Sequence, residues 1–235
     1  MEITPLGDSA LIIRVIGNRD DLAPDSVEQV LEAKDRIEAA TIPGVVELPS
    51  AYTTVAAFYD PVRAIDAGAP ADDVVGWMEQ KIRTALSEKV RAGHAETRLV
   101  EIPVCYANEF ALDRDDVAQR SGLDWKEVVD LHCGAEYRVH CVGFTPGFPF
   151  LGGMPRKLAT PRRDVPRKEI PAGSVAIGGA QTGIYPVKSP GGWNVIGRTP
   201  LRLFDPQKDP PALLRAGDRV RLRSIIREEF EAMTQ

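Results

Sequence analysis

The chain has 235 residues, of which 43% are hydrophobic and 27% charged, and its formal net charge is −5. This balance predicts a globular protein with a substantial apolar core, large enough for one big domain or two ordinary ones. The acidic excess argues against nucleic acid as the main partner, because phosphate backbones bind net basic surfaces.

Three further features concern the compartment. No apolar run approaches the length of a membrane span, so we expect no membrane contact. Residues 1–3 begin with an acidic pattern and lack the basic segment of a signal peptide. The three cysteines are an odd number without the spacing of a disulfide framework, which is typical of a reducing compartment. We therefore expect a cytoplasmic protein.

The first part of the chain alternates strand-like and helical patterns. Residues 9–16 are mostly apolar and predict a buried strand. Ser26, with Gln29 three residues later, forms a capping box that opens a helix. The remaining elements predicted here are strands at residues 45–48, 53–59 and 99–104 and a helix that opens at residues 70–73.

The order strand, helix, strand, strand, helix, strand suggests a ferredoxin-like unit whose last strand, residues 99–104, leads into the next domain. No chemical motif occurs in this part, and its apolar helical stripes are typical of core. The segment 91–97, which contains Gly93, is the expected boundary. We therefore predict a small α/β domain at residues 1–94 and a second domain at residues 95–235.

Two short helices are predicted next. Asp113 caps a helix that stops at Gly122, and Asp124 with Glu127 forms a second capping box. The pair superficially resembles a helix-turn-helix. Six acidic against three basic residues between Asp113 and Asp130 argue against DNA docking. We interpret it as a helical pair that covers one end of a barrel.

Residues 143–199 are the stretch around which the rest is organised. They hold 11 of the 20 glycines and 8 of the 19 prolines, which leaves no room for an ordinary helix. They also hold many large apolar residues, which argues against disorder. Short strands joined by tight turns, as in a β-barrel or sandwich, are the better interpretation. Flanking strands are predicted at residues 137–142, 201–204 and 220–226, and a short helix at 226–233.

The same stretch carries eight Lys or Arg residues against two acidic ones, in a chain that is acidic elsewhere. Positive charge beside glycine-rich backbone is what an anionic ligand needs. The alternative is a basic, solvated loop at residues 156–168. Phe144, Phe148, Phe150 and Trp193 are either an apolar docking patch or barrel core.

Two motif matches within this region are weak. Residues 192–199 read G-W-N-V-I-G-R-T, which lacks the lysine of a phosphate-binding loop and leads into a strand-like segment rather than a helix. The pairs His132-Cys133 and His140-Cys141 match no usual zinc spacing, so we expect no metal site. There is no Ser-His-Asp signature and no G-x-S-x-G turn, which argues against covalent hydrolysis by this chain.

Several motifs together carry a family resemblance. They are G-F-T-P-G-F-P-F-L-G-G-M-P, K-L-A-T-P-R-R, V-P-R-K-E-I-P-A-G-S-V-A-I-G-G-A-Q-T-G-I-Y-P, S-P-G-G-W-N-V-I-G-R-T-P and L-F-D-P. These closely resemble the family of the 5-oxoprolinase B subunit, also labelled allophanate hydrolase subunit 1, which includes an inhibitor of a sensor histidine kinase. The resemblance implies an α+β fold with a small ferredoxin-like N-terminal α/β domain and a C-terminal cyclophilin-like β-barrel.

The resemblance also implies partners and a reaction. The B subunit would act with the 5-oxoprolinase C subunit in ATP-dependent activation of 5-oxoproline, and the A subunit would complete ring opening to glutamate. ATP with Mg²⁺ would be bound by the complex, and the chain would be inactive alone. The alternatives are a binding module that inhibits a sensor histidine kinase and a partner domain in a urea or allophanate carboxylase-type system.

The candidate site residues are those whose side chains or backbone suit such an anionic amide ligand. Lys188 and Arg198 are expected as anion contacts, and His132 as an acid/base group, the alternative for His132 being interaction with its helix C-terminus. Expected substrate ligands are Gln181, Thr182, Tyr185 and Ser189. Expected nucleotide-binding glycines are Gly178, Gly179, Gly191 and Gly192.

Overall fold

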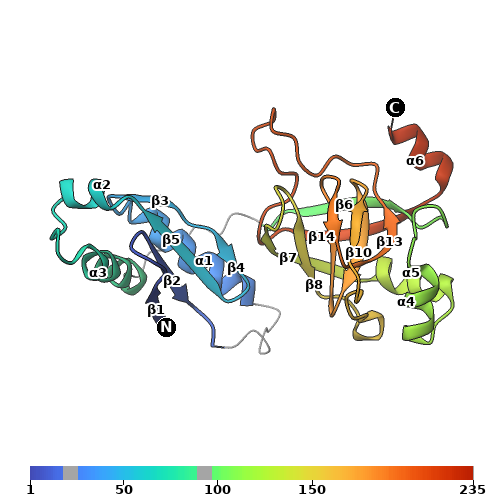
Figure 1. Ribbon diagram of the computed structural model, residues 1–235, viewed down its shortest axis with the longest axis horizontal. Coiled ribbons are helices and arrows are strands. Elements are labelled where there is room, and N and C mark those ends of the chain that lie inside the picture. Colours follow the sequence, from blue (N-terminus) through green and yellow to red (C-terminus); the bar gives the residue numbers. More distant parts are fainter. Residues whose placement is uncertain (18–25, 89–96, 235) are drawn as a thin grey trace. The chain divides into compact units, whose positions relative to one another are not determined.

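The computed structural model describes residues 1–17, 26–88 and 97–234. The chain divides into two compact units, Met1–Glu96 and Thr97–Gln235, each of which is described by itself (Figure 1). The boundary predicted at residues 91–97 lies mainly outside the described residues.

The first unit is built on one antiparallel sheet. Its order is β1-β2-β5-β3, with the short β4 also paired to β5. Alternation along β5 buries Val55, Ala57 and Tyr59 on one face of this sheet. The strands are β1 (Glu2–Pro5), β2 (Ala10–Arg14), β3 (Val45–Glu47), β4 (Ser50–Ala51) and β5 (Thr54–Tyr59).

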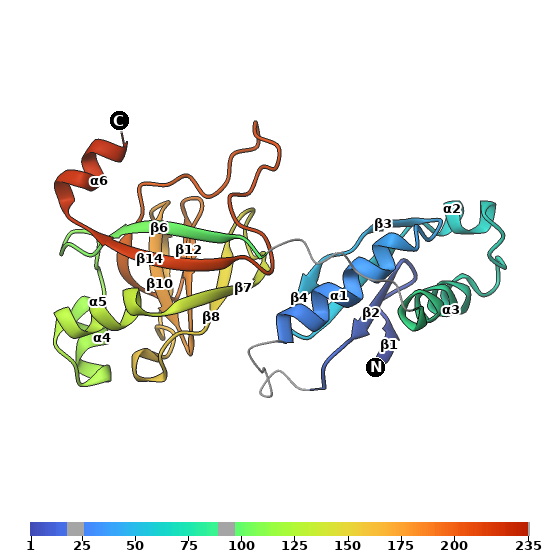
Figure 2. The same cartoon turned by 180° about the vertical axis from the view of Figure 1, so that it is seen from behind.

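Helices cover the buried face of this sheet. The long helices α1 (Ser26–Ala39) and α3 (Val74–Ser87) pack against each other and share an apolar core with the strands; Figure 2 shows α1 running along the sheet. A short helix, α2 (Pro61–Asp66), was not predicted. The sequence does contain the start signal of this helix, because Asp60 caps it and Pro61 occupies its first position.

The α+β fold class is confirmed, with one correction to the placement of a strand. Strand β6 (Leu99–Cys105), predicted as the last strand of the first unit, pairs with β14 and β13 of the barrel instead. The sheet keeps a ferredoxin-like order because β1 occupies the edge beside β2. The prediction missed β1 because it is only four residues long and ends in a proline.

The second unit is a closed barrel with the order β10-β11-β8-β7-β14-β6-β13, in which β13 returns to β10. A separate two-stranded sheet pairs β12 with β9. The strands are β7 (Glu136–Val142), β8 (Pro149–Gly152), β9 (Arg167–Ile170), β10 (Ser174–Gly178), β11 (Gln181–Ile184), β12 (Ser189–Gly191), β13 (Asn194–Arg198) and β14 (Arg219–Ile225). The prediction of many short strands across the glycine-rich stretch is confirmed.

Helices α4 (Arg114–Ser121) and α5 (Trp125–Gly134) lie together at one end of the barrel (Figure 1). The capping box of Asp124 and Glu127 is present, and Gly122 ends α4 with a φ of 64°. A 3₁₀ helix at Arg156–Leu158 contacts both, and α6 (Arg227–Thr234) contacts β6. Every helix in the described ranges is too short or too polar to cross a bilayer.

Residues 201–204 do not form the predicted strand. Their only ladder contact among the described residues is a single bridge between Phe204 and Ala212. Prolines at positions 200, 206, 210 and 211 explain the difference, because each lacks the N–H that a ladder requires.

The barrel unit contains two distinct large apolar clusters. The barrel interior gathers aliphatic residues from most strands with Tyr106 and Tyr137. The aromatic cluster consists of Phe148, Ile170, Ala176, Tyr185, Trp193 and Val195, with Phe150 packed against it. This second cluster positions the candidate site.

Candidate functional site

A cavity of about 350 Å³ opens beside the aromatic cluster; we call it the aromatic pocket. Its walls come from segments far apart in the sequence: the loop before β8, the segment before β9, the end of β11 and the turn between β12 and β13. It is lined by Phe144, Phe148, Phe150, Arg162, Arg163, Pro166, Tyr185, Pro190, Gly191, Gly192 and Trp193. Its size and mixed lining are typical of a small-molecule site.

Phe148 is the centre of the pocket's aromatic wall. Its ring meets Tyr185 at 5.2 Å and Trp193 at 5.5 Å between centroids, both edge to face. Such geometry fixes each ring against its neighbours. At the rim, Phe144 lies edge to face with Phe148 but is 65% exposed and has a φ of 72°. A bulky residue rarely adopts this left-handed conformation, so the surrounding loop must hold it there.

Two glycines predicted to bind a nucleotide, Gly178 and Gly191, lie against the rings of the aromatic cluster. A Cβ added to Gly178 would lie 2.4 Å from the Trp193 ring, and one added to Gly191 would lie 2.3 Å from Tyr185 Oη. The absence of a side chain at these positions therefore lets the rings approach the backbone. Gly192 lines the pocket, whereas Gly179 lies in the β10–β11 turn with a φ of 65°.

Positive charge borders the pocket on the side of residues 162–167. The Arg162 guanidinium lies 5.7 Å from the centroid of the Trp193 ring, within the range of a cation–π contact. Arg163 also lines the pocket and pairs with the buried Asp113. The predicted basic loop is thus partly a pocket wall rather than wholly a solvated surface.

Tyr185, a predicted substrate ligand, is buried in this wall. Burial raises the pKa of its phenol, and a backbone hydrogen bond at Trp193 and the charges of Arg162 and Arg167 oppose that rise only in part. The hydroxyl therefore stays protonated at neutral pH and can donate a hydrogen bond.

His132, predicted as an acid/base group, lies in the barrel interior and has no exposed surface. Thr182 Oγ1 donates to the Ala176 carbonyl, so His132 Nε2–H must be the donor in its 3.0 Å contact with that oxygen. Nδ1 then accepts from Tyr106 Oη at 2.8 Å. Burial lowers the pKa of His132 to about 3, which keeps the ring neutral. These contacts favour a structural role for His132, which is predicted as an acid/base group, and for Thr182, which is predicted as a substrate ligand.

The predicted anion contacts Lys188 and Arg198 do not line the aromatic pocket. Lys188 is an exposed partner of Glu169, with 2.7 Å between Nζ and Oε1. Arg198 donates from Nε to the Ala172 carbonyl at 2.9 Å and lies near the Phe110 ring. Both cations are thus engaged in contacts with the fold, and neither is brought to the pocket that holds Tyr185.

The last two predicted ligands are Gln181 and Ser189. Gln181 begins β11 and is half-buried. Ser189 begins β12, and its buried Oγ has no hydrogen-bond partner within the barrel unit as described. Neither lines the pocket, so the structure gathers Tyr185, Gly191 and Gly192 from the predicted set and leaves the others outside.

Two further features of the described residues bear on nucleotide and metal binding. The segment 192–199 contains strand β13 and does not open a helix, and the backbone N–H of Val195 is used by Asp113. It does not fit a phosphate-binding loop. No three His, Cys, Asp or Glu side chains gather as a metal site in residues 1–17, 26–88 and 97–234.

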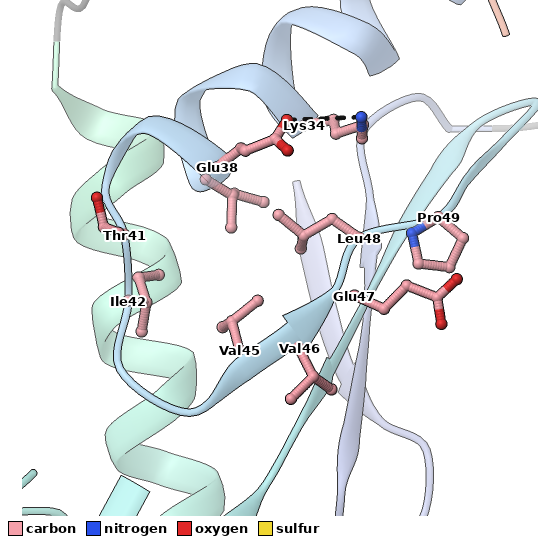
Figure 3. A pocket seen from close by; sticks show the side chains of 10 residues that line it. Lys34, Glu38, Thr41, Ile42, Val45, Val46, Glu47, Leu48 and Pro49 are labelled. Carbon is pink, nitrogen blue, oxygen red and sulfur yellow. Dashed lines mark ion pairs between the residues drawn. The ribbon is translucent and has the colours of Figure 1, made fainter. Parts of the chain in front are cut away.

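A second cavity, of about 440 Å³, lies in the first unit between the end of α1 and β3. Figure 3 shows its lining of aliphatic side chains together with Thr41 and Glu47, with the ion pair of Lys34 and Glu38 at one edge. It lacks the aromatic wall and the arginines of the aromatic pocket. We therefore take the aromatic pocket as the candidate site.

Comparison with known proteins shows the family to which the chain belongs. A family model described as carboxyltransferase domain, subdomain C and D, matches residues 1–214. The 5-oxoprolinase B subunit of Bacillus subtilis (strain 168) is 42% identical over 236 aligned residues, covering 98% of this chain and 95% of that protein. The chain belongs to this carboxyltransferase-domain family. The resemblance to the 5-oxoprolinase B subunit that its motifs indicate is confirmed.

Two further similarities support the family. The 5-oxoprolinase B subunit of Escherichia coli O157:H7 is 54% identical over 134 residues, which are 57% of this chain and 62% of that protein. The crystal structure of TTHA0988 superposes with a TM-score of 0.75 and 35% identity, covering 92% of this chain and 40% of that one. The fold is therefore shared with experimentally determined members.

Sequence reasoning missed part of the site in this carboxyltransferase-family chain. Arg162 and Arg163 were counted only as local charge, although the repeated arginines in P-R-R-D-V-P-R were visible. Asp113 was interpreted as a helix cap. Nothing in the sequence indicates that a carboxylate fifty residues upstream meets Arg163, because the pairing depends on tertiary structure.

Proposed function

We propose that this chain is the B subunit of a cytoplasmic, ATP-dependent 5-oxoprolinase. It would act with the C subunit to activate 5-oxoproline, and the A subunit would open the ring to give glutamate. The names of its relatives support this assignment. The structural observation that carries it is the aromatic pocket, which combines ring surfaces with two arginines at one opening.

The pocket suits the chemistry of 5-oxoproline, a five-membered lactam that bears one carboxylate. Guanidinium groups pair well with carboxylates, so Arg162 and Arg163 are the proposed carboxylate contacts. The Phe148 and Trp193 rings offer apolar surface for the lactam ring. The protonated Tyr185 hydroxyl is a donor suited to the lactam carbonyl.

In this proposal, ATP phosphorylates the lactam oxygen, which makes the ring amide susceptible to opening. The residues of this chain bind and orient the lactam for that step. We assign the nucleotide and its Mg²⁺ to the complex as a whole, because the glycine-rich stretch of this chain does not fit a phosphate-binding loop. We accordingly expect the chain to be inactive alone.

Substitution of Arg162 tests the ligand assignment. We expect Arg162→Gln to weaken 5-oxoproline binding to the folded chain by about tenfold, the loss of one charge-assisted hydrogen bond. Binding of 2-pyrrolidinone, which has the lactam without the carboxylate, should stay unchanged. Isothermal titration of both compounds is the measurement, and Arg221→Gln on β14 is a charge-matched control outside the pocket. Equal losses for both compounds would contradict the carboxylate contact.

The activity itself is tested by phosphate release from ATP with this chain and the C and A subunits. We expect stimulation by 5-oxoproline only in the full mixture. Absence of stimulation with well-folded, associated subunits would contradict the proposed function. A requirement for a biotinylated carrier would favour the carboxyltransferase alternative, which the name of the matching family model suggests.

A second candidate function is inhibition of a sensor histidine kinase. The observation that favours it is Phe144, whose exposed side chain is held at the pocket rim by a left-handed backbone conformation and suits insertion into a protein surface. It predicts a stable complex with a kinase dimerisation helix when no other 5-oxoprolinase component is present. Phe144→Ala should abolish that complex, and size-exclusion chromatography would detect the loss.

A further inference from the structure

Asp113 stands immediately before α4 but does not cap it. Its side chain makes no hydrogen bond to the first turn of the helix, although aspartate is favoured at this position for that bond. Its side chain is only 1% exposed. Burial of a carboxylate is unfavourable unless the charge is paired, so the partners of Asp113 define its role.

Those partners are two arginines and one backbone amide. Arg167 donates from Nη1 to Oδ2 at 2.7 Å and from Nη2 to Oδ1 at 2.8 Å, a two-point pair. Arg163 donates from Nη1 to Oδ1, and the backbone N–H of Val195 donates to Oδ2 at 2.7 Å. The buried carboxylate of Asp113 thus faces two guanidinium groups, one of which, that of Arg163, also pairs with the exposed Asp116 at 3.7 Å.

The cluster is connected to the aromatic pocket through Arg163, which lines it. The backbone N–H of Arg163 donates to the Gly192 carbonyl at 2.8 Å, and that of Asp113 donates to the Val195 carbonyl at 2.9 Å. Arg163 is therefore fixed at its backbone by the β12–β13 turn and at its guanidinium by Asp113. These contacts leave the guanidinium little freedom to move away from the pocket.

We propose that Asp113 is a positioning residue, which holds the Arg163 guanidinium at the pocket wall to bind the carboxylate of an anionic ligand. Asp113 does not touch the ligand and acts through Arg163. The ligand class rests on the proposed function, whereas the placement of Arg163 rests on the contacts above.

The variant Asp113→Asn distinguishes the positioning of Arg163 from a simple effect of charge on ligand binding. The substitution removes a negative charge beside the pocket, so electrostatics alone predicts tighter binding of an anion. Positioning predicts the opposite, since the two-point pair and the Arg163 contact are both weakened. We expect the Kd for 5-oxoproline to rise by about tenfold and the Kd for 2-pyrrolidinone to change by less than about twofold.

Two further variants serve as matched controls. Asp116 lies 3.7 Å from the same Arg163 nitrogen but is largely exposed. Asp116→Asn should therefore leave 5-oxoproline binding unchanged or slightly tighter. Asp113→Glu keeps the charge but moves the carboxylate, so we expect it to weaken binding as Asp113→Asn does.

A second readout follows the guanidinium directly, with nitrogen-15 arginine NMR of the full chain. We expect separately resolved Nη resonances for Arg163 and Arg167 in the wild type, because fixed pairing slows rotation of the guanidinium. Arg163→Lys and Arg167→Lys assign the signals. In Asp113→Asn the Arg163 Nη resonances should merge into one averaged signal.

Two results would overturn the proposal: unchanged or tighter 5-oxoproline binding by Asp113→Asn, or averaged Nη resonances for Arg163 in the wild type. The second result does not depend on Asp113→Asn, so it decides the question even if that variant fails to fold. If the arginine signals behave as expected while the wild type binds no 5-oxoproline, the positioning of Arg163 is supported and the proposed function of the pocket fails.

Discussion

The barrel interior and the aromatic pocket both contain polar groups among apolar neighbours, but they differ in how fully those groups are hydrogen-bonded. In the interior, His132 uses both ring nitrogens, on Tyr106 and Thr182, and its carbonyl accepts from Tyr137 Oη at 2.6 Å. Beside the pocket, Arg163 Nε has no hydrogen-bond partner among the described residues. The interior network is closed, whereas the pocket keeps unused hydrogen-bonding capacity.

This difference gives a criterion for separating structural from ligand-binding polar groups. A closed network rigidifies a core and offers nothing to a ligand. A donor left unpaired carries a desolvation cost that a ligand can relieve. By this criterion His132 belongs to the scaffold, whereas Arg163, whose Nε is unpaired and which lines the pocket, belongs to the site.

The largest expected effect comes from opening the closed network. His132→Leu removes the acceptor of the Tyr106 hydroxyl and leaves that donor buried and unpaired. We expect a loss of about 2–4 kcal/mol in the free energy of unfolding of the barrel unit. Urea denaturation followed by Trp125 and Trp193 fluorescence, in a Trp77→Phe background, measures it. A loss below about 1 kcal/mol would contradict the structural role.

The pH dependence of the unfolding free energy, measured for the wild type and for His132→Leu, serves as a control. The folded-state pKa of His132 is lowered to about 3, while the unfolded chain titrates near 6.5. As the pH falls, the unfolded state therefore takes up the proton first. The neutral, buried His132 contributes its whole stabilisation above pH 6.5, and this stabilisation is lost as the pH drops towards 3. The stability difference between wild type and His132→Leu should accordingly shrink between pH 6.5 and pH 4. A constant difference would show that the histidine is not buried in its neutral form.

A smaller effect is expected where the aromatic pocket is packed against backbone. Gly178→Ala places a Cβ within 2.4 Å of the Trp193 ring, so the ring must shift. We expect a loss of about 1–3 kcal/mol in unfolding free energy, typical of overpacking, and weaker 5-oxoproline binding. Gly179→Ala is the comparison in a turn, with open space around the added Cβ but a φ of 65°. Unchanged Trp193 fluorescence and binding in Gly178→Ala would contradict the packing role.

The smallest effect is expected outside both regions. Lys188→Ala breaks an exposed ion pair with Glu169, and such pairs contribute about 0–1 kcal/mol to stability. We expect unchanged 5-oxoproline binding and unchanged activity of the assembled complex. A tenfold loss of activity in a folded Lys188→Ala complex would return Lys188 to the candidate site.

The sequence predicts the periodic parts of this fold well. The α5 capping box and the strands around Tyr137 and Val220 follow from local patterns that the structure confirms. The position of Leu99–Cys105 was less predictable, because a strand's pattern shows that it pairs but not with which neighbour. Residues 201–204, which prolines flank at positions 200 and 206, show the limit in the other direction, because their apolar content did not produce a strand.

The site was harder to predict than the fold. Tyr185, Gly191 and Gly192 were found because they lie in one conspicuous motif. Asp113 was misjudged because an aspartate before a helix is ordinarily a cap, and only tertiary contacts divert it to Arg163 and Arg167. Lys188 and Arg198 were selected for their charge, but charge alone does not indicate whether a neighbouring residue already uses it.

The pairing of β6 has a consequence for how the barrel is made. As the first strand of its unit to be synthesised, β6 pairs with β13 and with β14, the last two strands of the barrel. It has no ladder neighbour until β13 has left the ribosome, and the barrel cannot close until β14 has followed, so closure waits for the end of the unit. The sheet of the first unit, by contrast, has all its strands before β6 and can fold while the barrel is still being translated.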